Sequence, residues 1–173
     1  MPQFLKWVVV GVGLTIATLA YSDDTVPLYL APGGLEAAGP DGPRVFAMGD
    51  TGRTDIIAVA SAAWGEPLDE YSMEECGYGE MEFAEFGSGV TLAFDGDAFI
   101  GWMTEPDAGA RFENGTGAGS PVIDIETVAG PVETFESSIG HEFAADNVFG
   151  IASGPGTNAT VEMLWSGVSC IFR

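Results

Sequence analysis

Asp95 and Asp97 are two carboxylates one residue apart, set between apolar runs in the stretch GVTLAFDGDAFIGW. Such a pair could act as general acid and base in a hydrolase, supply oxygen ligands to a cation, or form the tip of a β-hairpin. Asp-Gly between alternating apolar runs is a strong hairpin signal, because both residues tolerate a positive φ. The sequence therefore predicts a turn at residues 95–97 rather than a catalytic pair.

The other chemical motifs are incomplete, so we predict no catalytic and no cofactor-binding residues. His141 is the only histidine, and neither a nucleophile elbow nor a second zinc-protease histidine accompanies it, which favours a structural or surface role. The glycine-rich stretch at residues 115–120 opens a predicted helix, yet it matches no phosphate-loop pattern and has no lysine. A small secreted hydrolase that uses carboxylates remains the alternative, since only spatial separation decides whether carboxylates pair.

Oxygen ligands of the kind that calcium prefers are present, but not in a complete calcium-binding loop. They are Asp95, Asp97, Glu74, Glu75 and Glu80. We therefore expect no dedicated metal site and at most weak binding of divalent cations. An acidic, cation-binding surface protein is a further alternative.

The charge balance is strongly acidic, with 26 acidic residues against five basic ones. A surface of this kind repels nucleic acid and anionic membrane, because both require cationic groups to neutralise phosphate. It suits a soluble protein, a cation-rich medium or a basic protein partner. Most of the carboxylates are expected to be solvated surface groups.

Residues 1–22 are predicted to be a signal peptide that is removed on export, to the periplasm or to the medium. Lys6 is followed by the apolar run WVVVGVGLTIATLA, and small residues precede Asp23. The run is shorter than the ~20 residues that a spanning helix needs, but an uncleaved membrane anchor is the alternative. In an exported chain, Cys76 and Cys170 would most simply form one disulfide. For a loop of roughly 95 residues, the chain-entropy model predicts that this disulfide stabilises the folded state by about 4 to 5 kcal/mol.

The remainder divides into a Pro/Gly-rich linker (residues 23–43, with one short strand at 28–30) and two similar units (44–109 and 110–173). In each unit an extended segment and a Gly/Thr turn precede a helix that ends at a glycine, Gly65 or Gly130. Thr54 is expected to cap the first helix; Ser120 is expected to cap the second, with Pro121 at its first position. The apolar faces should hold Ile56, Ile57, Ala60, Ala63 and Trp64 in the first helix and Val122, Ile125 and Ala129 in the second.

Each helix is followed by an acidic segment, LDEYSMEE or VETFESS, and then by runs typical of strands. Met81 and Phe83 alternate with Glu80 and Glu82, which predicts one wet and one buried face. Further strands are expected at residues 90–94 and 98–103, and at 147–152, 159–164 and 167–172. The sequence thus predicts an α+β fold of two packed repeats, each a short helix against an antiparallel meander.

One arrangement occurs twice: a helix that ends at a glycine followed closely by a proline, at residues 51–67 and 116–131, and then a meander. This arrangement resembles a known one. It is similar to the helix-plus-sheet repeats of β-lactamase inhibitor protein and of small SmpA/OmlA-type envelope proteins. The chain departs from these in having no lipobox cysteine and no clear helix pair per repeat. The resemblance implies a non-enzymatic, protein-binding or envelope-associated module, and it carries over no contact residues.

Overall fold

The computed structural model describes residues 26–40 and 42–171 and has an α+β fold. Two antiparallel sheets, one of three strands and one of eight, are combined with few helices, which confirms the predicted α+β class. The predicted signal peptide lies outside the described residues. Within them, no helix is both long enough and apolar enough to cross a membrane.

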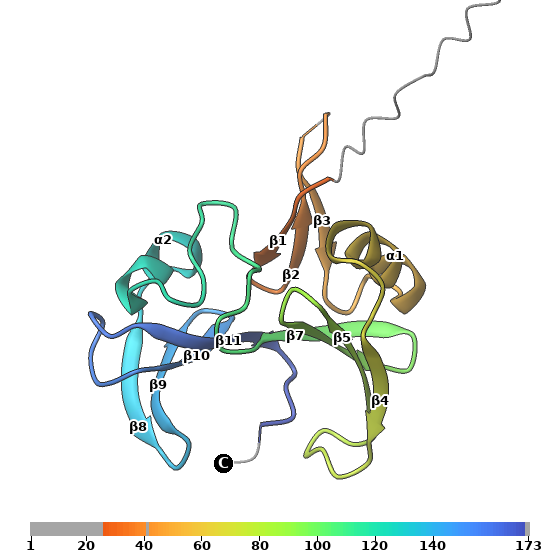
Figure 1. The fold of residues 1–173 in the computed structure, drawn as a ribbon. Coiled ribbons are helices and arrows are strands. Elements are labelled where there is room, and N and C mark those ends of the chain that lie inside the picture. Colours follow the sequence, from red (N-terminus) through yellow and green to blue (C-terminus); the bar gives the residue numbers. More distant parts are fainter. Residues whose placement is uncertain (1–25, 41, 172–173) are drawn as a thin grey trace, which may run out of the picture.

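The eight-stranded sheet consists of two four-stranded meanders that meet at its centre, where β7 pairs with β11. The strand order is β4-β5-β6-β7-β11-β10-β9-β8. The bounds are β4 (Asp69–Met73), β5 (Met81–Phe86), β6 (Val90–Asp95), β7 (Ala98–Thr104), β8 (Glu133–Ser137), β9 (Gly140–Ala145), β10 (Val148–Ala152) and β11 (Val161–Gly167). Figure 1 shows this sheet as an arch whose ends, β4 and β8, turn away from the helices.

The main core lies between the convex side of the arch and a layer above it, so we call this side the helix face and the opposite side the open face. The layer contains α1 (Arg53–Trp64), η1 (Val122–Ile125), α2 (Glu126–Ala129), β1 (Leu28–Ala31), β2 (Gly34–Ala37) and β3 (Arg44–Ala47). Trp102 of β7 is buried in this core, and its indole N–H donates to the Ala31 carbonyl at 3.1 Å. Full burial of each large apolar side chain contributes about 1.5–3 kcal/mol.

Helix α1 has the predicted apolar face but not the predicted cap. Ile56 and Ala60 are fully buried, and the other three predicted residues pack against the same core. The N-cap residue is Gly52, with no side-chain hydrogen bond, so the assignment of Thr54 as cap was wrong. Instead the Arg53 N–H donates to the Asp97 carbonyl at 2.7 Å, because the β6–β7 hairpin tip lies against the start of the helix.

The second helix is shorter than the first and begins as a 3₁₀ turn. Val122, Ile125 and Ala129 are buried as predicted. Pro121 occupies the N-cap in an extended conformation, not the first helical position, and Ser120 does not cap the helix. The Ser120 hydroxyl accepts the Gly117 N–H at 3.1 Å, so it is engaged in the preceding turn.

Two strands occupy part of the segment predicted to be a linker. Strand β1 contains the expected residues 28–30, whereas β2 was not expected. Leu30 and Leu35 are buried in the main core, and β2 pairs with β1 and β3. This part of the chain therefore packs into the domain.

The structure corrects the predicted strand pattern in three places. The acidic segments form the edge strands β4 and β8, which hydrophobicity alone did not reveal because their side chains are mostly exposed. Residues 159–164 and 167–172 were predicted as two strands, but one strand, β11, ends at Gly167. Strand β5 is buried on both faces: Met81 and Phe83 pack with Cys76 on the open face, while Ala84 and Phe86 pack in the main core.

Candidate functional site

One row of register partners crosses the open face of the large sheet from edge to edge. In strand order from β4 to β8 the row is Asp69, Glu85, Thr91, Met103, Trp165, Phe149, Ala144 and Glu133. Partners in adjacent strands lie on the same face. The row therefore places carboxylates at both ends and apolar side chains in the middle.

The second half of the open face carries apolar side chains that lack a covering layer. We call Phe135, Phe149, Ile151 and Met163 the apolar strip. Phe135 is 45% exposed, the other three are half-buried, and neither apolar cluster of the described residues contains them. Trp165, 3% exposed, stacks on Phe149 with ring centroids 6.1 Å apart. Phe149, Ile151 and Met163 are neighbours in paired strands, whereas Phe135 is separated from Ile151 by Glu142 of β9, which is buried.

The first half of the same face is covered. The predicted disulfide between Cys76 and Cys170 is present and fixes the C-terminal segment beneath β5 to β7. Met81, Phe83 and Ala93 are buried there together with Cys76. The C-terminal segment can pack closely against β7 only because residue 101 is a glycine. A Cβ atom at this position would collide with the Val168 carbonyl. The disulfide thus closes a second, smaller core.

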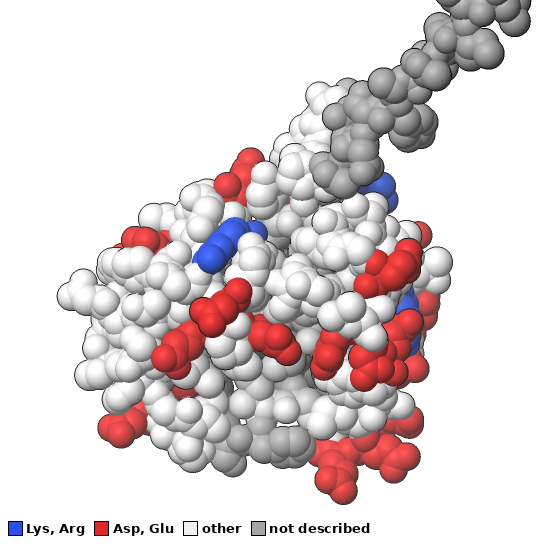
Figure 2. Space-filling model, viewed as in Figure 1, with Lys and Arg blue, Asp and Glu red and all other residues white. Residues whose placement is uncertain are grey.

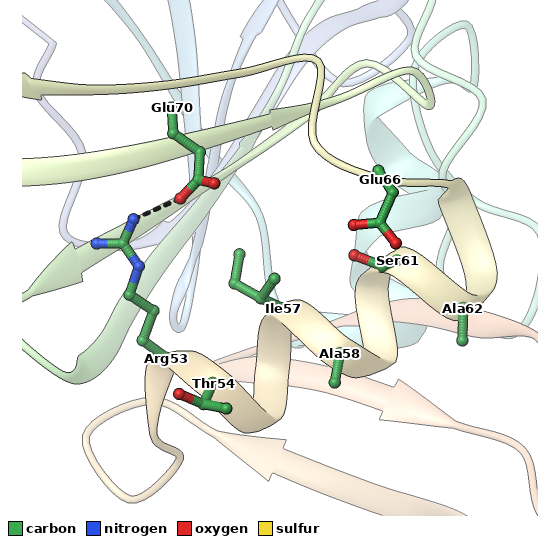
Figure 3. Close-up of a pocket in the computed structure, with 8 residues that line it drawn as sticks. All are labelled: Arg53, Thr54, Ile57, Ala58, Ser61, Ala62, Glu66 and Glu70. Carbon is green, nitrogen blue, oxygen red and sulfur yellow. Dashed lines mark hydrogen bonds and ion pairs between the residues drawn. The ribbon is translucent and has the colours of Figure 1, made fainter.

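The surface around these regions is strongly negative. Figure 2 shows acidic side chains over much of the visible face, concentrated on the side of β4, with few basic groups between them. On that side, helix α1 and strand β4 enclose a shallow groove on the helix face of the molecule (Figure 3). Its lining is Arg53, Thr54, Ile57, Ala58, Ser61, Ala62, Glu66 and Glu70.

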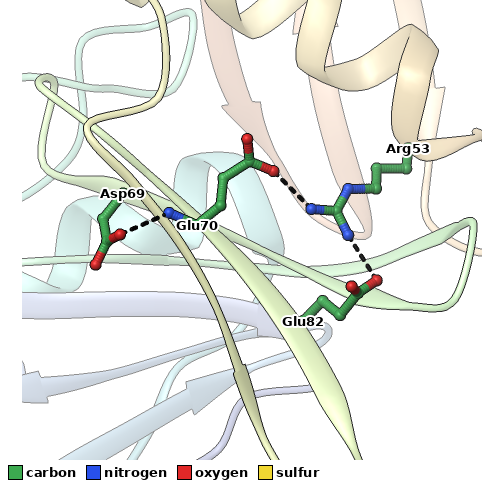
Figure 4. A network of polar contacts seen from close by, with 4 residues as sticks. All are labelled: Arg53, Asp69, Glu70 and Glu82. Atoms are coloured by element: carbon green, nitrogen blue, oxygen red, sulfur yellow. Dashed lines mark hydrogen bonds and ion pairs between the residues drawn. The ribbon is translucent and has the colours of Figure 1, made fainter.

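Arg53 lies at one end of this groove, where it forms ion pairs with two glutamates. Its guanidinium lies 2.6 Å from Glu70 of β4 and 2.6 Å from Glu82 of β5 (Figure 4), and 4.9 Å from the Phe94 ring centroid. Desolvation lowers the pKa of Arg53, but the hydrogen bonds and charges of Glu70 and Glu82 outweigh it and raise that pKa above its ordinary value. Because both carboxylates are about half exposed, each pair contributes modestly to stability, and the network mainly fixes α1 against the sheet.

Tyr71 lies on the open face of β4, at the edge of the covered half. It stacks on Phe83 with ring centroids 5.2 Å apart. Burial, followed by the charge of Glu85 and a hydrogen bond to it, raises the pKa of Tyr71 to about 12. The phenol is therefore protonated under all ordinary conditions.

The structure confirms the turn predicted at residues 95–97. Asp95 of β6 faces Ala98 of β7 across a two-residue connection, and Gly96 has φ +55°. A glycine at the first central position suits the tight turns that match the twist of paired strands. The Asp97 backbone carbonyl meets the start of α1, so this tip positions a helix.

The remaining predicted chemical residues lie apart from one another. His141, on β9, faces Glu136 and Ala152 in the adjacent strands. Within residues 26–40 and 42–171, no group of three or more His, Cys, Asp or Glu side chains is arranged to hold a metal ion. In the stretch at residues 115–120, the backbone N–H groups of Gly115 and Gly119 donate to the carbonyls of Phe112 and Val161. These N–H groups are engaged within the fold, not directed at a phosphate.

The apolar strip is the feature that sequence reasoning missed. Its residues come from β8, β10 and β11, and the hydrophobicity of the last two strands predicted burial. One signal was available: both VFGIA and MLW lack polar side chains at consecutive positions, which indicates apolar side chains on both faces of a strand.

Comparisons of the chain with protein-family models, curated proteins and solved structures give no match.

Proposed function

We propose that this protein is an exported, non-enzymatic module that binds a protein partner through the open face of its large sheet. The observation that carries the proposal is the apolar strip of Phe135, Phe149, Ile151 and Met163, which is partly exposed and belongs to neither buried cluster of the described residues. Contiguous exposed apolar side chains on a soluble domain are typical of interaction sites, and aromatic residues and Met are enriched in such sites. The disulfide is compatible with export.

The fold suggests how such a surface arises. We propose that residues 44–109 and 110–173 are two helix-plus-sheet repeats, as in β-lactamase inhibitor protein and the SmpA/OmlA-type envelope proteins. In support, each half of the chain places a helix before a meander of four strands, and the last strands of the two meanders, β7 and β11, pair. Two meanders joined in this way form one wide surface.

The chemistry of the open face favours a partner with an apolar centre and basic flanks. Glu133 lies at one end of the row that crosses this face, and Asp69 and Glu85 lie at the other. Such charges steer a basic partner and repel an acidic one. An interface centred on aromatic side chains would supply the affinity.

The test is quantitative capture of partners from the native compartment by immobilised wild type and by an Ile151→Asp variant. Ile151 is half-buried on the open face, so we expect the fold to survive, and one stoichiometric partner should bind the wild type and be lost on substitution. The matched control is Val45→Asp, because Val45 is an exposed apolar residue (60%) outside the large sheet. A partner that both variants retain, or turnover of a substrate by the purified protein, would contradict the proposal.

A further inference from the structure

We propose that the groove between α1 and β4 binds a cationic, extended segment of a partner protein, which adds as a strand beside β4. This site lies on the helix face and is separate from the apolar strip, so it does not depend on the function proposed above. Three observations carry it: the shape and lining of the groove, the free edge of β4, and the charge at the rim.

The groove has a floor that a peptide can contact closely. Thr54, Ala58 and Ala62 are exposed on the outer face of α1, so no long side chain projects from these positions. Ile57, half-buried, contributes apolar surface at the bottom. In Figure 3 the helix forms one side of the groove, and Glu70 stands across from it. Small apolar side chains of an extended segment fit against such a floor.

Strand β4 offers backbone groups next to this floor. Among the described strands it pairs only with β5, and four of its five residues are exposed. The Glu70 N–H donates to the Asp69 carboxylate at 2.9 Å, which indicates that it faces the open edge of β4. Because backbone groups alternate in direction along an antiparallel strand, Ser72, two residues on, also directs its N–H and C=O to the open edge. An added strand would take up these groups, as in other cases of strand addition.

The charge at the rim selects the partner. Glu66 and Glu70 line the groove, and Arg53, the only cation in its lining, is already paired with Glu70 and Glu82. A second copy of this chain, with net charge −21, would be repelled, whereas a segment with Lys or Arg at alternate positions would be attracted. The acidic edge thus prevents self-association and admits a basic strand.

The experiment uses a short capped peptide in which lysine alternates with alanine and valine, titrated into the purified protein by calorimetry at low and moderate salt. Wild type should bind it with 1:1 stoichiometry, whereas a peptide with glutamate in place of lysine should not bind. Glu66→Gln should weaken binding about two- to fivefold, because one exposed charge pair is lost. Ala62→Arg, which fills the floor and adds a like charge, should weaken it by about tenfold or more.

The controls separate strand addition from general attraction between opposite charges. Glu136→Gln removes an exposed carboxylate from β8, the other edge strand, outside the row that crosses the open face, and should leave affinity unchanged. A lysine peptide N-methylated along one edge cannot form the backbone hydrogen bonds and should bind much more weakly. Equal binding of the N-methylated peptide, equal weakening by Glu136→Gln, or unchanged binding to Ala62→Arg would each overturn the proposal.

Discussion

The two halves of the large sheet share a strand order, yet only one of them buries its open face. In the first half, Met81 and Phe83 lie beneath Cys76 and the C-terminal segment. In the second half, Ile151 and Met163 lie side by side in paired strands without such a layer. The strands themselves are similarly apolar, so the difference comes from a single cross-link and the segment that it fixes. The comparison shows that two similarly apolar halves of one sheet can differ in exposure because one covering segment lies over only one of them.

The edge strands of the two halves also differ in how their aromatic side chains are packed. Tyr71 on β4 stacks on Phe83 and hydrogen-bonds to Glu85, so it belongs to the covered region. Phe135 on β8 is 45% exposed and faces Glu142 in the next strand. Both edge strands carry carboxylates, which discourage pairing with another sheet. Both edge strands are mostly exposed, but the aromatic side chain of β4 packs on the smaller core, whereas that of β8 does not.

The largest expected effect comes from removing the cross-link. The double substitution Cys76→Ala and Cys170→Ala should lower the free energy of unfolding by about 2–5 kcal/mol. It should also make the first half resemble the second, because Met81 and Phe83 lose their cover. Chemical denaturation measures the first effect, and binding of a dye specific for exposed apolar surface measures the second. Reduction of the wild type should reproduce both, and unchanged dye binding would show that the C-terminal segment holds its place without the disulfide.

A smaller effect is expected at the hairpin tips, which use different residues in the two halves. Gly96 has φ +55° in the first half, and Asp146 has φ +46° in the second. Gly96→Val should destabilise the protein by about 1 kcal/mol or more, because a β-branched residue is strained at positive φ. Asp97→Asn should change stability little, because its contact with α1 uses the backbone carbonyl.

Asp146→Gly is a further change, at the β9–β10 tip of the second half. It relieves positive-φ strain but increases the freedom of the unfolded chain, so the net effect should stay within about 0.5–1 kcal/mol. Thermal or urea denaturation of the three variants checks the order. A loss of partner binding by Asp97→Asn at unchanged stability would instead make this tip a functional site.

The smallest effect concerns pH. The pKa of Tyr71 is about 12 in the folded protein, against an ordinary value of 10. Between these values the unfolded chain releases a proton that the folded chain keeps, so the contribution of Tyr71 to stability is complete below pH 10 and is lost as pH rises toward 12. Tyr71→Phe should therefore lose less stability than wild type between pH 9 and pH 11.

Urea denaturation at the two pH values measures this difference, and absorbance near 295 nm follows the phenolate directly. Tyr78→Phe is the control, because Tyr78 is 58% exposed. An equal pH response of Tyr71→Phe and wild type would show that Tyr71 is not held in the covered half as described.

The sequence by itself determined the features that depend on neighbouring residues. The apolar face of α1, the glycine that ends each helix and the turn at residues 95–97 all follow from local periodicity and from the φ values that glycine allows. The disulfide followed from cysteine count and expected export. These inferences needed no knowledge of what each segment packs against.

Only the tertiary structure decided which apolar surfaces are buried and how the helices begin. Thr54 was not required as a cap, because a distant carbonyl at Asp97 receives the first helical N–H. Phe83 and Ile151 lie in similar apolar strands, but a layer from far along the chain covers only the former. Burial depends on contacts between residues remote in sequence, and strand periodicity specifies only which side chains share a face, not what covers that face.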